Sequence, residues 1–405
     1  MNELTSLGLI LLFALLVGHL VKFARIPEVT GYLLAGMVVG PSVLGWVSHE
    51  NLRALHVFSE VGLGLILFSI GSVFEFSRMK LIGRKVFVVA AAESCTAAVL
   101  VFAAMLILGQ PWPVALLLGA IAVETGAAST LMVIRESNSK GPFTEAVTSV
   151  IGLNNILALL AFSLAAATLD LSSMLTDSGV SSTGIARSIF PLLWQLIGSS
   201  ALGFLIGILL ASWASKVVES GEVLILLVGC VLLTVGIASA LDLSPLVGSL
   251  AVGATMANLS KKSRKLFEAL SRTDPPLYVI FFVLAGADLD LALLPTLGTL
   301  GLGYVVARAV GKLLGSSIAA RKVDFGKKIE RLLGFSIFAQ AGLAVGLVLV
   351  TRQRFPEIAP TVATVVLGAV IVFEIVGPLS AKFALGRSGE SRPQVMDTLL
   401  PAADA

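Results

Sequence analysis

Apolar residues fill long stretches of this 405-residue chain, with short polar segments between them. The stretches run to roughly 17 to 25 residues, enough for a helix to cross the ~30 Å hydrocarbon layer of a bilayer. A β-barrel would alternate apolar and polar positions, but segments such as 7–16 and 224–235 are apolar on every side. The pattern predicts an all-α polytopic membrane protein. We expect about thirteen spans, near 4–24, 30–48, 57–75, 86–108, 112–134, 146–169, 189–214, 222–241, 244–258, 276–290, 294–319, 332–351 and 360–385.

Composition agrees with this interpretation and argues against a soluble enzyme. The chain is 57% hydrophobic and 13% charged, with a mean hydropathy of +0.98, against ~25% charged residues in soluble domains. Cys95 and Cys230 both fall in apolar spans, without the close spacing of a disulfide framework or metal site. Because no Walker A or dinucleotide-binding glycine motif occurs, we expect no cofactor and no ATP-driven pumping.

Basic residues indicate how the spans are oriented. With thirteen spans, the odd-numbered loops and the tail hold 22 of the 28 Lys and Arg residues, and the opposite side holds four. Cytoplasmic loops are enriched in Lys and Arg. The count predicts an outside N-terminus and a cytoplasmic C-terminus. We therefore expect an inner-membrane protein with residues 386–405 as a short cytoplasmic tail. We also expect no nucleotide-binding domain in this chain.

The two halves of the chain resemble each other at an offset of about 215 residues. Gly36 corresponds to Gly253 at a similar offset, and Gly71 corresponds to Gly286. An offset of seven spans reverses the direction of each matched helix. The chain therefore shows the pattern of an inverted-topology repeat, which is common in secondary transporters.

Ionisable residues inside the spans are the first functional candidates, because a charge at mid-membrane costs at least ~2.5 kcal/mol. The charged ones are Glu93, Glu124, Arg308, Lys312 and Glu374, and the notable neutral polar ones are Asn154, Asn155 and Gln340. We expect Lys312 to face the core, although its side chain could instead extend to the cytoplasmic surface. Arg308 is expected to form structural ion pairs with Glu93 or Glu374.

Two spans contain small and hydroxyl residues where a helix could break. The fifth has Glu-Thr-Gly-Ala-Ala-Ser-Thr at 124–130, and its equivalent in the twelfth is Phe-Ala-Gln-Ala-Gly at 338–342. Two broken helices meeting at the midplane would offer half-helix ends and unwound carbonyls to an ion. The alternative is close helix packing, which small residues also permit.

Several segments, in this order, resemble the cation:proton antiporter superfamily, in particular its bacterial Kef-type and Na+/H+ exchanger branch. The segments are 25–36, 40–45 (Gly-Pro-Ser-Val-Leu-Gly), 60–63, 68–71, 141–144 and 281–290. The resemblance implies exchange of Na+ or K+ for protons by alternating access. It also implies a homodimer, with residues 1–80 and 222–292 as the panel domain, 86–169 and 293–387 as the moving core, and 189–214 as a linking helix.

One departure from this family affects the site. Relatives usually carry an aspartate in the sixth span, where this chain has Asn154 and Asn155, and generally a small residue where it has Glu124. We therefore expect the titrating carboxylate to have moved to Glu124, in a site for Na+ or K+ and protons. That site consists of Glu124, Thr125, Asn154, Asn155, Gln340 and Lys312.

Two other functions remain open. The asparagine pair would also suit a Na+-coupled solute symporter, similar in architecture to bile-acid:sodium symporters, or an uncoupled ion conductor. A membrane sensor that has lost transport is the third possibility.

Overall fold

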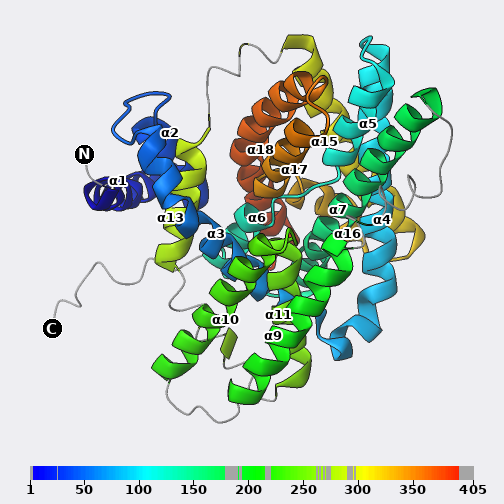
Figure 1. Ribbon diagram of the computed structural model, residues 1–405. Helices are drawn as coiled ribbons and strands as arrows, with labels where there is room; N and C mark the ends of the chain where they lie inside the picture. Colours follow the sequence, from blue (N-terminus) through cyan, green and yellow to red (C-terminus); the bar gives the residue numbers. More distant parts are fainter. Residues whose placement is uncertain are drawn as a thin grey trace, which may run out of the picture.

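The computed structural model describes residues 3–24, 26–177, 190, 194–214, 220–260, 263, 266–267, 270, 275–289, 295 and 298–391. Within these ranges the chain is helical and contains no strand (Figure 1). The first half comprises α1 (Glu3–Phe23), α2 (Glu28–Val39), α3 (His49–Gly71), η1 (Ser72–Phe74), α4 (Phe76–Ile107), α5 (Trp112–Ile121), α6 (Ala127–Glu136) and α7 (Pro142–Asp177). The second half comprises η2 (Trp194–Gly198), α9 (Ser199–Ala214), α10 (Ser220–Ala240), α11 (Pro245–Leu259), α13 (Pro275–Ala287), α15 (Gly298–Lys322), α16 (Lys327–Ser336), α17 (Gly342–Arg354) and α18 (Ala359–Ser388).

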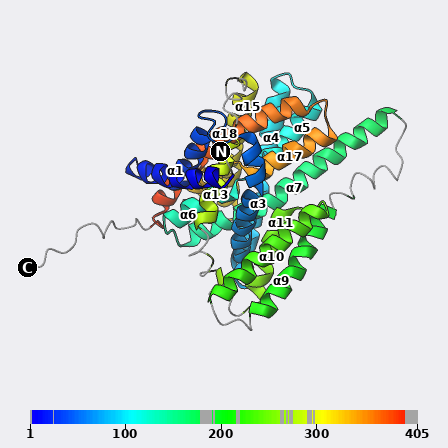
Figure 2. The same ribbon diagram turned by 60° about the vertical axis from the view of Figure 1, so that its left-hand side comes forward.

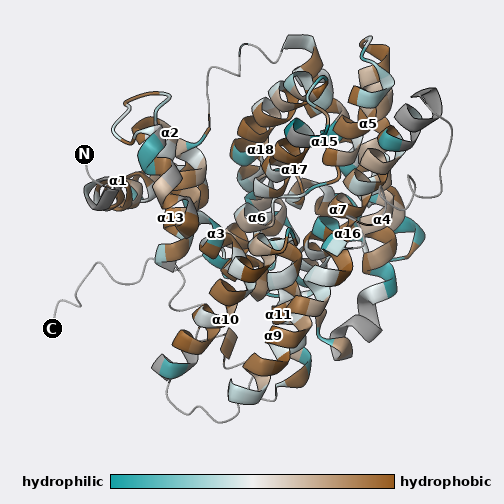
Figure 3. Cartoon of the chain, in the orientation of Figure 1, coloured by the Kyte–Doolittle hydropathy of each residue, from teal (hydrophilic) through white to brown (hydrophobic). Residues whose placement is uncertain are grey.

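Every predicted span contains helix, and the fold is that of a polytopic membrane protein. Within the part of the chain that the structure describes, four segments are long and apolar enough to cross a bilayer as single helices: Gly83–Ile107, Pro142–Asp170, Trp194–Ala214 and Ala359–Ser388. Hydrophobic residues run along most helices in Figure 3, and Phe204, Leu205 and Trp213 of α9 are more than half exposed. Such a surface requires lipid around it. The number of crossings stays a prediction, and most of the tail, 392–405, lies outside the described residues.

One predicted span is too long. The apolar pattern suggested helix from 30 to 48, but α2 ends at Val39. Gly40 is extended, with ψ of 175°, because Pro41 follows it and disfavours helical geometry in the preceding residue.

Both predicted helix breaks are present. The fifth span consists of α5 and α6, joined by unwound residues 122–126, and the twelfth consists of α16 and α17, joined by 337–341. The first break begins two residues before the predicted segment 124–130, whose second half is helical. The two breaks lie 215 residues apart, as the repeat requires. Non-helical backbone at membrane depth is tolerated only where protein or a water-filled cavity surrounds it, so these breaks must find partners inside the bundle.

Two close helix crossings follow the repeat. A methyl group built on Gly36 of α2 would lie 2.0 Å from the carbonyl oxygen of Val283 in α13, and Gly286 approaches α2 equally closely. The other crossing joins α3 and α11 through Gly71 and Gly253. The repeat matches Gly36 with Gly253 and Gly71 with Gly286. It therefore relates the α2–α13 crossing to the α3–α11 crossing, as a pseudo-two-fold axis would.

The helices form two packed groups. In one, α2 contacts α1 and α13, while α11 contacts α3, α9 and α10. In the other, α4 packs along α15 and against α5, and α16 lies between α15 and α18. Figures 1 and 2 show α9, α10 and α11 side by side at one end of the molecule. The division into panel and core, with 189–214 as a linking helix, stays a prediction.

The α2–α13 crossing should not tolerate a side chain. Gly36→Ala is expected to destabilise the protein by ~1–3 kcal/mol, because the added methyl collides with backbone that cannot rotate away. Thermal unfolding in detergent measures the effect. Gly229→Ala on α10 is the matched control, since nothing lies within 4 Å of its added methyl. Equal stability of the two variants would contradict the proposed crossing.

Candidate functional site

The two unwound segments contact each other directly. The Gly126 amide donates to the Ala339 carbonyl at 2.8 Å, and the Thr130 hydroxyl donates to the Ser336 carbonyl at 3.1 Å. Gly377 of α18 lets that helix lie against the backbone of Ala339, since a methyl group on Gly377 would be 2.7 Å from its Cα atom. Contacts to backbone atoms thus hold the two breaks against each other where they cross.

Arg308 of α15 binds the carbonyls that the breaks expose. Its Nε donates to Ala122 O at 3.1 Å and its Nη1 to Phe338 O at 2.6 Å. Its Nη2 donates to Glu124 O at 2.5 Å and to Ala339 O at 3.1 Å. These carbonyls follow the C-terminal ends of α5 and α16, where helix dipoles are negative. One planar guanidinium therefore serves both breaks.

The expected ion pairs of Arg308 are not those of the structure. The guanidinium contacts the four carbonyls and the Phe373 ring, whose centroid is 4.3 Å from the guanidinium carbon. Glu93 instead pairs with Lys312 at 3.0 Å, and the Glu374 carboxyl contacts Ser129. The sequence prediction was wrong because the unwound carbonyls compete for the guanidinium.

Lys312 faces the core and is fully buried. Besides Glu93, its Nζ donates to the Val123 carbonyl at 2.7 Å and to Thr125 Oγ1 at 2.8 Å. The side chain does not extend to the cytoplasmic surface. Since Arg308 and Lys312 are four residues apart on one helix face, α15 presents two cations to the first break.

The predicted site residues fall into separate networks. The amide nitrogen of Asn154 donates to Thr125 Oγ1 at 3.0 Å, so Asn154, Thr125 and Lys312 form one network. Asn155 is buried, but its amide donates to the Ile151 carbonyl of its own helix at 3.1 Å.

Gln340 belongs to another network on the second break. Its Nε2 donates to the Ile121 carbonyl at 3.2 Å and lies 2.9 Å from the Tyr304 hydroxyl. Its Oε1 is buried and has no hydrogen-bond partner. A carbonyl oxygen can only accept a hydrogen bond, so the Gln340 atom that faces the Ile121 carbonyl is the amide nitrogen. Gln340 therefore presents an oriented and unpaired oxygen.

Glu124 and Glu374 lack the ion pair that Glu93 has. Glu124 Oε2 accepts the backbone N–H of Ala341 at 3.2 Å, next to the N-terminus of α17. The Glu374 carboxyl contacts the Ser129 hydroxyl. Both carboxyls are buried, at 1% and 4% exposure.

The buried ionisable groups do not balance. Among the residues that the structure describes, the buried Lys, Arg, Asp and Glu side chains are Arg308, Lys312, Glu93, Glu124 and Glu374. Two cations face three carboxyls, so full ionisation leaves a net charge of −1. Uncompensated charge is costly in a low-dielectric interior. One further positive charge, from a proton or a bound cation, would neutralise the cluster.

Sequence reasoning missed three side chains that complete these networks. Ser94 lies 3.5 Å from Asn154 Oδ1 and 3.4 Å from Glu93 Oε1. Ser129 contacts Glu374, and Tyr304 contacts Gln340. Ser129 stood within the noted small-residue segment, but no sequence signal distinguished it. Among the described residues, no group of His, Cys, Asp and Glu could hold a resident metal.

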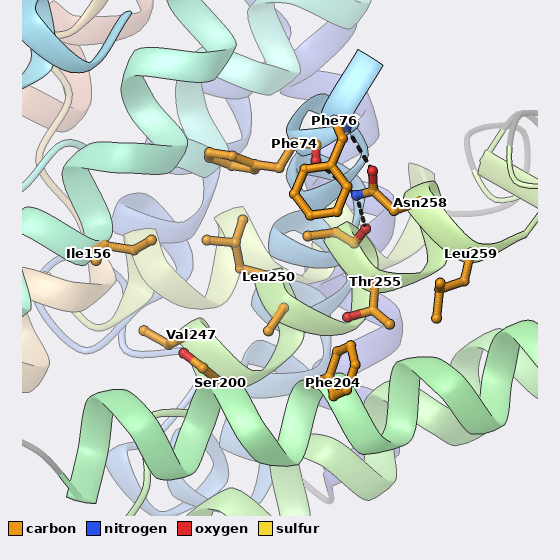
Figure 4. Close-up of a pocket in the computed structure, with 12 residues that line it drawn as sticks. Phe74, Phe76, Ile156, Ser200, Phe204, Val247, Leu250, Thr255, Asn258 and Leu259 are labelled. Carbon is orange, nitrogen blue, oxygen red and sulfur yellow. Dashed lines mark hydrogen bonds between the residues drawn. The ribbon is translucent and has the colours of Figure 1, made fainter. Parts of the chain in front are cut away.

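Two cavities lie beside the site. One, of about 270 Å³, is lined by Glu60, Gln195 and residues of α7, α11 and α17, including Gly342. Its lining residue Gly342 directly follows Ala341, and the backbone amide of Ala341 contacts Glu124. The other, of about 310 Å³, is lined mainly by apolar side chains between α7, α9 and α11 (Figure 4). There Asn258 is bonded to Phe76 N and Phe74 O, so its amide is not free to bind an ion.

Comparisons with known proteins agree with this architecture. The family model described as sodium/hydrogen exchanger, transmembrane, matches residues 8–386. The ammonium/H+ antiporter subunit AmhT of Alkalihalophilus pseudofirmus is 23% identical over 340 residues, which are 83% of each chain.

Solved structures show the same fold. A structure of the sodium proton antiporter MjNhaP1 from Methanocaldococcus jannaschii at pH 8 has a TM-score of 0.67 and 18% identity, covering 96% of this chain and 97% of that one. An electron-microscopy structure of the same antiporter has a TM-score of 0.73 and 17% identity, covering 98% of both chains. Because the family model spans nearly the whole sequence, the chain belongs to the sodium/hydrogen exchanger family of transmembrane proteins.

Proposed function

We propose that this protein is a secondary transporter that exchanges a monovalent cation, Na+ or K+, for protons across the inner membrane. The observation that carries the proposal is the position of Glu124, a buried carboxyl at the crossing of two broken helices. Ammonium, named for the AmhT relative, belongs to the same class of monovalent cations.

The charge of the buried cluster supports exchange. Three carboxyls and two cations leave room for one added positive charge. A proton and a monovalent cation would each neutralise the cluster, and both together would leave it with an excess charge. Binding of the proton and binding of the cation to the cluster therefore oppose each other, which is the physical requirement for coupled antiport.

Glu124 and Gln340 are the best cation ligands among the six proposed site residues. Hard monovalent cations prefer oxygen ligands, and Gln340 Oε1 is an oriented oxygen without a partner. The oxygens of Thr125 and Asn154 already lie within hydrogen-bonding distance of Lys312 and Ser94, so this network positions Lys312 beside the break. Asn155 has a smaller part in this arrangement, since its amide is bonded to its own helix.

Transport would proceed by alternating access. In this proposal residues 86–169 and 293–387 form a core that moves against a panel of 1–80 and 222–292, through which two copies dimerise. With the N-terminus outside, the cavity at Glu60 and Gly342 opens toward the outer face and gives access to the crossing. The two helix groups and the small residues at the crossing support this mechanism.

Glu124→Gln should abolish exchange without unfolding the protein, because the amide keeps the size of the carboxyl but lacks the negative charge that attracts the cation. Proteoliposomes containing a pH dye should show cation-driven proton flux for the wild type and only background flux for the variant. Glu357→Gln, which changes an exposed carboxyl, is the control.

Persistent flux in Glu124→Gln would place the essential carboxyl elsewhere. No proton flux in the wild type would favour Na+-coupled symport, uncoupled conduction or a sensor without transport.

Gln340→Met should weaken apparent cation affinity about tenfold, or ~1.4 kcal/mol, because the thioether fills the space but offers no hard oxygen. The KM for the cation in proteoliposomes measures the loss. Tyr304→Phe serves as the comparison, since it removes the hydroxyl near Nε2 and leaves Gln340 Oε1 in place. A KM unchanged in Gln340→Met would exclude this oxygen as a ligand.

A further inference from the structure

Glu374 of α18 makes an unusual contact with Ser129 of α6. The serine Oγ lies 3.0 Å from one carboxyl oxygen and 2.9 Å from the other. Glu374 is 4% exposed and Ser129 is fully buried. The two oxygens are therefore equally close to one hydroxyl in a site without bulk water.

The hydrogen atoms available decide how both contacts are satisfied. A serine hydroxyl has one hydrogen and can donate it to one oxygen, while its lone pairs can accept. With Glu374 ionised, Ser129 can donate its hydrogen to one carboxylate oxygen, and the close contact of Oγ with the other oxygen has no hydrogen to bridge it. With Glu374 protonated, Ser129 donates to the carbonyl oxygen and the acid O–H donates back to Oγ. The paired geometry thus fits the neutral acid.

The surroundings of Glu374 also favour the neutral acid. Among the described residues no cation forms an ion pair with Glu374, and its carboxyl contacts the Ser129 hydroxyl. Arg308 of α15 lies over the neighbouring Phe373 ring and is bonded to carbonyls. On the helices packed against α18, the other charged side chains lie in end turns, are exposed or have partners of their own. They are Glu28 on α2, Arg135 and Glu136 on α6, Glu145 and Asp170 on α7, Lys312, Arg321 and Lys322 on α15, Lys327, Lys328, Glu330 and Arg331 on α16, and Arg352 and Arg354 on α17.

The other two buried carboxyls have partners that suit the anion. Glu93 is paired with Lys312 at 3.0 Å. Glu124 accepts an N–H beside the N-terminus of α17, where the helix dipole stabilises negative charge. If the cation-free cluster holds one proton for neutrality, Glu374 is the carboxyl whose contacts accommodate it.

We propose that Glu374 is the proton-binding group of the exchanger in its cation-free state, while Glu124 remains ionised and binds the cation. This inference rests on the proposed function. When the cation binds at Glu124, the O–H bond of Glu374 breaks, its electron pair stays on the carboxylate, and the proton leaves to water. One positive charge replaces another, so the cluster stays neutral. Ser129 connects this change to α6, which begins three residues after Glu124.

Counting protons released on cation binding tests the proposal. Purified full-length protein in detergent, weakly buffered with a pH-indicator dye, is mixed with NaCl or KCl, and choline chloride controls for ionic strength. The wild type should release about one proton per chain. Its cation affinity, measured by calorimetry, should change up to about tenfold per pH unit where the proton competes.

Glu374→Gln is the decisive variant, because its amide can make both contacts with Ser129 and mimics the neutral acid permanently. It should bind the cation more weakly than the wild type, because the uncharged amide leaves the cation-bound cluster with an excess positive charge. Binding should release no proton, and the affinity should no longer depend on pH. Glu124→Gln should lose both binding and release. Thermal unfolding checks that both variants remain folded.

Infrared difference spectra provide a second readout in the wild type. Cation binding should remove the C=O band of a protonated carboxylic acid, and Ser129→Ala should shift that band because its hydrogen-bond partner is lost. A band insensitive to Ser129→Ala would overturn the proposal.

Undiminished proton release from Glu374→Gln would also overturn the proposal and place the proton on Glu124, with antiport intact. Cation binding to the wild type with no proton release would contradict the proposed function itself.

Discussion

The attachment of Arg308 to the two helix breaks is the contact on which the rest of the site depends. Unwound backbone inside a membrane protein exposes carbonyls that lipid cannot satisfy. Arg308 donates to two carbonyls of each break, so one side chain fixes both segments. Because the breaks are held in this way, Glu124 and Gln340 sit at defined positions on unwound backbone. A lysine, which lacks the planar fork of arginine, could not reproduce these contacts.

Around this anchor, the buried charges form a unit that is one positive charge short of neutrality. Lys312 and Glu93 satisfy each other, and Arg308 is occupied by carbonyls. Glu124 and Glu374 therefore face the remaining imbalance together, one beside a helix N-terminus and the other against a hydroxyl. In the mechanism that we propose, this division of partners lets the cluster hold either a proton or a cation.

The anchor joins two segments that the internal repeat relates. The repeat relates the two breaks, and it also relates the two glycine crossings outside the site. However, the two halves carry different chemistry at equivalent positions: Glu93 corresponds to Arg308, and Thr125 to Gln340. A duplicated backbone thus supplies crossed helices of matching geometry, and a difference between the halves supplies Arg308, which binds carbonyls of both breaks.

Local patterns in the sequence determined the helical membrane fold, the repeat and the approximate position of both breaks, because lipid imposes length and polarity on each segment separately. They also identified Glu124, Lys312 and Gln340 as buried candidates. The partner of each buried charge depended on tertiary structure. Arg308 was matched with carboxyls, although it binds backbone carbonyls, and the contact of Ser129 was not foreseen. Contacts such as Ser129 with Glu374 join residues 245 positions apart, and they depend on the depth and rotation of packed helices, which no local pattern specifies.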